Sequence, residues 1–312
     1  MSFRITGTMI FNNLMSNMRQ SSKLMGDLQE QLVSMRRINR PSDDPIGASQ
    51  AQSLKSSEND YKQYDDNIDQ GRSMLDFTAS VLETMSSEVV NARSKLLSAI
   101  NPTADATSRE VTATELNDML KSIMVEANSS FGGIYVFGGT QTGSPPFEIA
   151  RGGAQGVESV AVNGESGRIR YVVGATDLVD VNENPTEVFM PRGEANGLFN
   201  TLIEIRTLMQ NPDGLSDGQL SQKLSEKVKS LDDVHDDIVR ALGRVGTRSK
   251  ALQIRRDLYA QAEISSAQRR SEIEDADIAD VVLRLKNQQT IFQVIIQSST
   301  SVYNSNLTDF LK

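Results

Sequence analysis

The sequence is constrained most by a 3-4 repeat of apolar and small residues that runs unbroken from Gly47 to Leu96. Charged residues lie mostly outside this seam, a pattern typical of coiled coils. A helix rises about 1.5 Å per residue, so the stretch would span roughly 75 Å, whereas a compact chain of this length has a radius of gyration of about 20 Å. The repeat predicts one very long helix, or two stacked ones, in an elongated protein. Its members are Gly47, Gln50, Leu54, Ser57, Tyr61, Tyr64, Ile68, Gly71, Leu75, Thr78, Leu82, Met85, Val89, Ala92 and Leu96.

Other helices must run beside this one, because a lone helix with an apolar seam is only marginally stable in water. Both ends of the chain keep the same spacing, and so does the stretch from Leu224 to Leu252; shorter helices are predicted near 107–130 and 198–209. The N-terminal stripe consists of Phe11, Leu14, Met18, Ser21, Met25, Leu28, Leu32 and Met35. The C-terminal stripe consists of Ile278, Val281, Leu285, Gln288, Phe292, Ile295, Ser299 and Val302, widened by Val282, Ile291, Ile296 and Tyr303.

The first and second helices are separated by the run Asn39-Arg40-Pro41-Ser42-Asp43-Asp44-Pro45. Ser42 is the expected N-cap of the second helix. Asp43 and Asp44 then lie where the helix dipole favours negative charge, and Pro45 fits the first turn, where its missing N–H costs little. Pro41, Ser42, Asp43, Asp44 and Pro45 together predict a helix-start turn.

The composition changes abruptly at Phe131, since 13 of the 21 glycines lie between Phe131 and Gly197. Four short runs within this region, 134–137, 157–162, 169–173 and 178–181, are rich in β-branched or aromatic residues, as strands are. Asn163-Gly164 is the expected tight turn of a hairpin near the second and third runs, with a longer loop that includes residues 165–167 as the alternative. These observations predict a small β-rich insertion.

The predicted fold is mainly α, with a long antiparallel coiled-coil stem formed by the N- and C-terminal regions and a small β-rich domain inserted mid-sequence. Residues 1–45 form an N-terminal assembly helix and turn, and residues 272–312 form a C-terminal assembly helix. The helical stem comprises residues 46–130 and 198–271, and the β-rich outer domain comprises residues 131–197.

Composition excludes several classes of partner. The formal charge of −9 and the pI of about 4.9 argue against nucleic acid, whose binding depends on clustered cations. No apolar run approaches the roughly 20 residues that cross a bilayer, so no membrane insertion is expected, and the first residues lack the pattern of a secretory signal. The small cluster Arg36, Arg37 and Arg40 is predicted to be solvated or salt-bridged, with an anionic partner as the alternative.

No catalytic, cofactor-binding or metal-binding residues are predicted. The single histidine, His235, falls on a helical seam, where a packing or hydrogen-bonded role is expected. The glycine-rich run 132–140 lacks the order and the lysine of a phosphate loop. Acidic pairs such as Asp65-Asp66 and Asp232-Asp233 are typical of solvated helix faces. We therefore predict a protein that is not an enzyme and needs no cofactor.

The terminal helices are predicted to need neighbours. Ordering the backbone costs about 1–2 kcal/mol per residue, whereas each buried large apolar side chain returns only about 1.5–3 kcal/mol. One stripe per helix cannot cover this cost, so other copies are expected to complete the burial. The predicted assembly interface comprises Phe11, Leu14, Met18, Met25, Leu28, Leu32, Ile278, Val281, Leu285, Phe292, Ile295 and Val302.

Two motifs resemble a known family. The run from Arg37 to Ile46, RINRPSDDPI, resembles the N-terminal signature of bacterial flagellins and hook-associated proteins, and the run from Ser271 to Ala279, SEIEDADIA, resembles their C-terminal counterpart. The segment IYVFGGT from Ile134 to Thr140, followed by Pro145-Pro146-Phe147, resembles the branch of the family that forms the hook–filament junction. Met35-Arg36-Arg37 departs from the family's more usual Gly-Lys-Arg-like turn.

The resemblance implies a structural axial protein of the bacterial flagellum that joins the hook to the filament. The implied partners are further copies of the chain in a ring, the first hook-associated protein, flagellin, and a flagellar export chaperone. It also implies export by the flagellar type III apparatus and an extracellular location at the junction. Three alternatives remain open: a short flagellin, a coiled-coil adhesin or scaffold unconnected with flagella, and an enzyme whose site lies in the β-rich insertion.

Overall fold

A computed structural model describes residues 7–101, 105–153, 156–164, 166–193, 197–210 and 214–310, with side chains in these ranges except those of residues 7, 8, 10, 11 and 301–310. The helices are α1 (Gly7–Ser34), α2 (Pro45–Ile100), α3 (Ala106–Ala127), α4 (Pro185–Phe189), α5 (Leu198–Gln210), α6 (Asp217–Glu274) and α7 (Ile278–Phe310). The strands are β1 (Ser130–Phe131), β2 (Ile134–Tyr135), β3 (Phe147–Gly153), β4 (Gly156–Val162), β5 (Arg170–Val172) and β6 (Leu178–Asp180). The chain divides into a terminal unit, Met1–Tyr61 with Gln261–Lys312, and a central unit, Lys62–Ala260.

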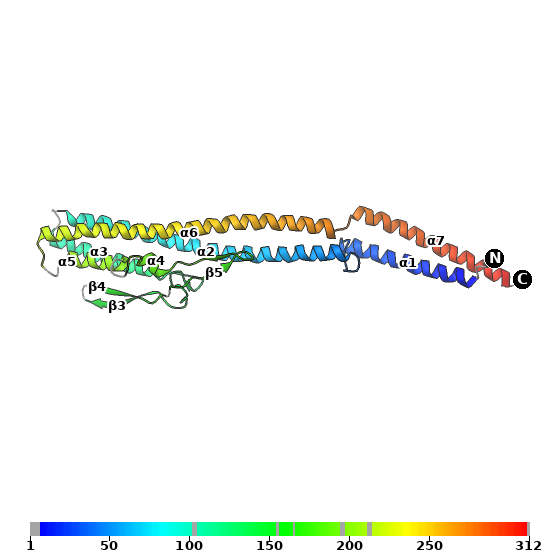
Figure 1. Ribbon diagram of the computed structural model, residues 1–312, viewed down its shortest axis with the longest axis horizontal. Coiled ribbons are helices and arrows are strands. Elements are labelled where there is room, and N and C mark those ends of the chain that lie inside the picture. The colour runs from blue at the N-terminus through cyan, green and yellow to red at the C-terminus, as the bar shows by residue number, and fades with distance from the viewer. Residues whose placement is uncertain are drawn as a thin grey trace. The chain divides into compact units, whose positions relative to one another are not determined.

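In the central unit, α2 and α6 run antiparallel as a coiled coil (Figure 1). The Arg93 guanidinium bonds the Asp232 carboxylate at 2.5 Å, and the rings of Tyr64 and Tyr259 lie 5.4 Å apart between their centroids. The Ser86 hydroxyl lies 3.0 Å from Nε2 of His235. His235 therefore has the hydrogen-bonded role on the helical seam that the sequence predicts.

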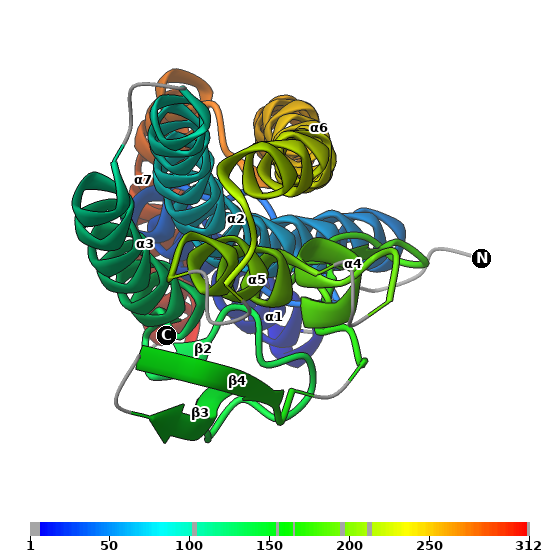
Figure 2. The ribbon, with the colours of Figure 1, turned by 90° about the vertical axis from the view of Figure 1, so that its left-hand side faces the viewer.

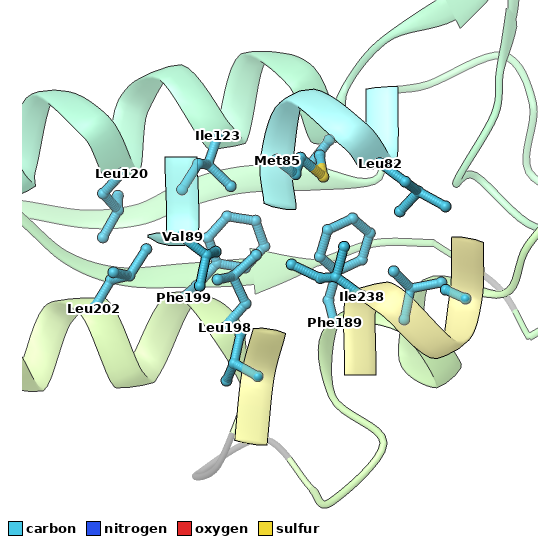
Figure 3. Close-up of a cluster of buried hydrophobic side chains, with 14 of the residues drawn as sticks. Leu82, Met85, Val89, Leu120, Ile123, Phe189, Leu198, Phe199, Leu202 and Ile238 are labelled. Carbon is cyan, nitrogen blue, oxygen red and sulfur yellow. The ribbon is translucent and has the colours of Figure 1, made fainter. Parts of the chain in front are cut away.

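The core of the central unit lies where α3 and α5 pack beside α2 and α6, as Figure 2 shows end-on. Figure 3 shows one cluster, in which side chains from five helices interdigitate. Every residue that it labels is buried, a position that favours folding by about 1.5–3 kcal/mol per large apolar side chain. They are Leu82, Met85 and Val89 of α2, Leu120 and Ile123 of α3, Phe189 of α4, Leu198, Phe199 and Leu202 of α5, and Ile238 of α6.

The β-rich insertion consists of three two-stranded antiparallel ladders: β1 with β2, β3 with β4, and β5 with β6. Gly132 and Gly133 join β1 to β2, and both have positive φ, 60° and 84°, as the tightest hairpin turns require. The prediction of a hairpin turn at Asn163-Gly164 was wrong. β4 pairs with β3 before it, and the Asn163 N–H donates to the Pro146 carbonyl at 2.8 Å, which continues that ladder.

A buried arginine fastens β4 to the helices. Arg206 of α5 is 3% exposed, and its Nη1 donates to the Val157 carbonyl at 2.5 Å and to Oδ1 of Asn117 at 3.1 Å. The same Asn117 oxygen accepts from the Val157 N–H at 3.0 Å. Burial lowers the pKa of Arg206, and the charge of Glu158 offsets this effect only in part. The hydrogen bonds of its Nη1 go to neutral oxygens, those of Val157 and Asn117.

The predicted fold class is confirmed, since long paired helices make up most of the described chain and small β hairpins lie mid-sequence. The sequence did not predict β1, β3 or α4. β3 contains Gly152 and Gly153, which are unfavourable in strands, and α4 is a single short turn within the insertion. No helix in the described ranges has both the length and the apolarity needed to cross a membrane.

Candidate assembly interface

The terminal unit contains the predicted interface, and there α1 and α7 lie side by side and antiparallel (Figure 1). Leu28 and Val281 are 7% and 5% exposed. The remaining predicted residues with described side chains are half-buried, except Ile278, which is 38% exposed. Those half-buried residues are Leu14, Met18, Met25, Leu32, Leu285, Phe292 and Ile295. Phe11 and Val302 have side chains outside the described residues.

The two polar members of the stripes bond each other. Nε2 of Gln288 donates to the Ser21 hydroxyl at 2.7 Å, and Ser21 is 4% exposed. A one-residue shift of either helix would separate these groups and leave a buried polar atom unpaired, which costs about 1–3 kcal/mol. The bond therefore fixes the register of α1 against α7.

The outer sides of the terminal helices remain apolar in places. Leu283, Ile291 and Val294 of α7 are 62%, 50% and 57% exposed. Leu283 and Val294 lie eleven residues apart, about three helical turns, so both point away from α1. On α1, Leu24 is 46% exposed. The α1–α7 pair thus uses one stripe of each helix and leaves further apolar surface uncovered.

The two sequence motifs meet where the helices break, at a place we call the joint (residues 35–45 and 273–278). The Arg37 N–H donates to the Glu274 carbonyl at 2.7 Å, and the Ala276 N–H donates to the Met35 carbonyl at 3.0 Å. Between these bonds, Arg36 and Asp275 form an antiparallel β-bridge. The main-chain groups freed by the break in one helix are therefore satisfied by the break in the other.

Charged side chains reinforce the joint. Glu274 bonds Arg36 at 2.9 Å and Arg270 at 3.1 Å, and Arg270 also bonds Glu58 of α2 at 3.0 Å. The hydrogen bond to Glu58, followed by that to Glu274, raises the pKa of Arg270. This network ties α2, α6 and the end of α1 together within the terminal unit.

The helix-start turn is capped by Asp44 and not, as the sequence suggested, by Ser42. Because α2 begins at Pro45, Asp44 takes the N-cap position, and its Oδ1 accepts from the Gly47 N–H at 2.9 Å. This hydrogen bond lowers the pKa of Asp44, and the charge of Arg37 adds to the effect. Oδ2 of Asp43 accepts from the Arg40 N–H at 2.8 Å, so Asp43 closes the turn instead of lying inside the helix.

Met35 is the one non-glycine residue with positive φ in the described ranges, at 58°. It follows the last residue of α1, where glycine is the residue that usually adopts this conformation. A side chain there costs roughly 1–2 kcal/mol. Met35 lies where the resembled family more usually has glycine. The chain therefore keeps the left-handed backbone conformation at this position without the glycine that favours it.

The described residues offer no group of three or more histidine, cysteine or acidic side chains that could hold a metal. Members of the acidic pairs on the helices are instead bonded by arginines. Asp65 bonds Arg256 at 3.3 Å, and Asp233 bonds Arg192 at 2.7 Å. Asp65 therefore joins α2 to α6, and Asp233 joins α6 to the segment that follows α4, where the sequence suggested solvated faces.

The sequence of this chain is similar to that of several known proteins. The model of the bacterial flagellin N-terminal helical region matches residues 5–142. Flagellar hook-associated protein 3 of Salmonella typhimurium is 25% identical over 311 residues, which cover 97% of this chain and 98% of that protein. Flagellar hook-associated protein 3 of Escherichia coli is 24% identical over 316 residues, which cover 99% of this chain and 100% of that protein.

Among solved structures, the flagellar junction protein FlgL of Legionella pneumophila is similar with a TM-score of 0.60 at 15% identity. The likeness covers 72% of this chain and 99% of that one. At such low identity it establishes the fold alone.

We expect Met35→Gly to raise the free energy of unfolding by about 1 kcal/mol, because it removes the strain of a left-handed side chain. Chemical denaturation of the purified chain measures the change. Ser34→Gly is the matched control: Ser34 ends the helix, so glycine there should lower stability by about 0.5–1 kcal/mol. Equal losses from both substitutions would contradict the strain at Met35.

We expect Asp44→Ala to destabilise the chain at neutral pH and to lose this effect in acid. The folded-state pKa of Asp44 is lowered, below an unfolded value of about 3.9. The contribution of Asp44 is therefore present above about pH 4 and lost as the pH falls through the folded pKa. Thermal unfolding from pH 7 to pH 3 measures it, with Asp60→Ala, an exposed site on the same helix, as control. A pH-independent difference would argue against a charged cap.

Proposed function

Since this chain belongs to the family of flagellar hook-associated protein 3, we propose that it joins the hook to the filament by polymerising through its terminal helices. It is a structural component of the extracellular part of the bacterial flagellum and not an enzyme. The observation that carries the proposal is the pair α1–α7, which buries one stripe of each helix and leaves apolar residues exposed along α7. Leu283, Ile291 and Val294 recur on this helix, and an apolar patch that recurs along one element favours contact with a partner.

The chain assembles with the axial components of the flagellum, and its finer contacts are proposed. It forms a ring with other copies of itself, between the first hook-associated protein on the hook side and flagellin on the filament side. A flagellar export chaperone keeps it competent for export by the type III apparatus. The family likeness over nearly the whole chain supports these partners.

The terminal stripes serve assembly in two ways. The inner residues, from Leu14 to Leu32 and from Val281 to Ile295, hold α1 against α7, and Phe11 and Val302 extend the stripes at either end. The outer residues of the same helices contact neighbouring copies. The half-burial of the inner stripes and the exposure of Leu283 and Val294 support this division.

Each segment of the chain has a separate role in the proposed assembly. Residues 1–45 and 272–312 assemble, residues 46–130 and 198–271 form the stem, and residues 131–197 form an outer domain that faces away from the axis of the ring. The clustering of the β hairpins within 131–197, apart from the terminal helices in sequence, supports this assignment.

Flagellin is the second candidate, because the matching family model describes the flagellin N-terminal region. A strain lacking the gene separates the two functions. If the chain is the junction protein, we expect bare hooks and flagellin monomers shed into the medium, measured by electron microscopy and by electrophoresis of the culture supernatant. Bare hooks with no shed subunit would identify the chain as flagellin, and intact filaments would refute both functions.

The outer face of α7 gives a residue-level test. We expect Leu283→Asp with Val294→Asp to leave the chain exported but unable to retain filaments, because two carboxylates replace exposed apolar contacts. Complementation of the deletion strain, scored by filaments per cell and by the chain in the medium, measures this. Val90→Asp with Val125→Asp adds the same charge at exposed sites of the central unit and should restore filaments. Normal filaments with the α7 variant would exclude this face as the contact.

A further inference from the structure

A groove of about 470 Å³ lies beside the joint, entirely within the terminal unit. Its lining combines the helix-start turn with the first turns of α2. Ile38 and Ala51, which are 6% and 7% exposed, form an apolar floor, and Pro41 and Pro45 also line it. Sites of this size, roughly 300–1,000 Å³, accommodate ligands or groups of side chains.

The rim of this joint groove is cationic. Arg36, Arg40 and Lys55 line it, against a single acidic residue, Glu274. Glu274 is already engaged by two arginines. Lys55 is exposed and, within the described ranges, makes no ion pair. Arg36 is paired with Glu274 and Arg40 with Glu30, so Lys55 is the rim cation that has no ion pair in the described ranges, on a chain whose net charge is −9.

A segment that fits the groove needs a free carboxylate and an exposed apolar side chain close together. Most acidic residues of the terminal unit are engaged: Glu30 by Arg40, Asp280 by Arg284, and Asp277 by the first amide groups of α7. Asp60 and Glu272 are exposed, but no exposed large apolar residue lies within one turn of either.

Asp27 of α1 meets both requirements. It is exposed, no described residue bonds its carboxylate, and Leu24, one helical turn before it, is 46% exposed. Residues three apart share one helix face. The face therefore presents one apolar and one anionic group together, which complements the floor and the rim of the joint groove.

We propose that the joint groove receives the α1 face carrying Leu24 and Asp27 from a neighbouring copy of this chain. The proposal rests on the proposed function, because a ring brings copies side by side. Leu24 contacts the floor, and the Asp27 carboxylate lies among the rim cations, near Lys55. This contact sets the spacing between copies at the level of the joint.

The absence of cysteine from the sequence allows a single-site cross-linking test in assembled flagella. Gln52→Cys places a thiol in the lining of the groove, and a maleimide benzophenone attached to it is photoactivated in purified hook–filament preparations. We expect a dimer-sized product, in which mass spectrometry finds the label joined to the peptide that contains residues 24–27. A label joined to another protein, or to another part of the chain, would overturn the proposal.

Charge exchange tests the ion pair. Lys55→Glu should reduce the dimer about fivefold, and adding Asp27→Lys should restore it. Lys250→Glu, an exposed lysine of the central unit, is the matched control and should leave the yield unchanged. An unchanged yield with Lys55→Glu would refute the contact. The presence of the chain in the purified preparation tests the proposed function separately, whatever the cross-link shows.

Discussion

The structure depends on one requirement, that the apolar seam of each long helix be covered by another helix running antiparallel to it. In the central unit α2 and α6 satisfy this requirement, and in the terminal unit α1 and α7 do. Ser21 and Gln288 are 267 residues apart in the sequence, so their contact closes a very long loop. The entropic cost of closing a loop rises only slowly with its length. Once α2 has paired with α6, the loop that the contact between α1 and α7 must close is much shorter. The pairing of α2 with α6 therefore lowers the entropic cost of bringing α1 and α7 together.

The joint follows from the same requirement. A break in only one of two paired helices would leave the main-chain groups at that helix end without partners, which is costly when they are shielded from water. Here the break after Ser34 lies opposite the break after Glu274, and main-chain hydrogen bonds cross between them. The strain at Met35 and the cap at Asp44 are local solutions to the problem of stopping and restarting a helix at a fixed place.

The sequence predicted the helices well because each carries a long periodic pattern. The seam from Gly47 to Leu96 lies within α2, and both terminal stripes lie within helices except for Met35, which follows the end of α1. The sequence predicted the insertion less well, because a short strand forms only where a partner strand is available. β4 pairs with β3, and the glycines of β3 prevent propensity rules from identifying β3 as a strand. The meeting of the two motifs at the joint was not foreseen either. The one sign of the joint in the sequence is that both motifs interrupt heptad patterns. The sequence does not show which helix breaks lie opposite each other.

The terminal stripes show what a heptad pattern can and cannot predict. Such a pattern predicts that a face is buried but not which chain buries it, and much of the burial of the predicted interface comes from the pairing of α1 with α7. The surface that we propose for contact with other copies comes from residues such as Leu24 and Val294, which fall outside the seams. This surface exists only when both ends of the chain are present, because each terminal helix is positioned by the other. The proposed assembly through paired ends therefore requires both terminal helices for the same contact.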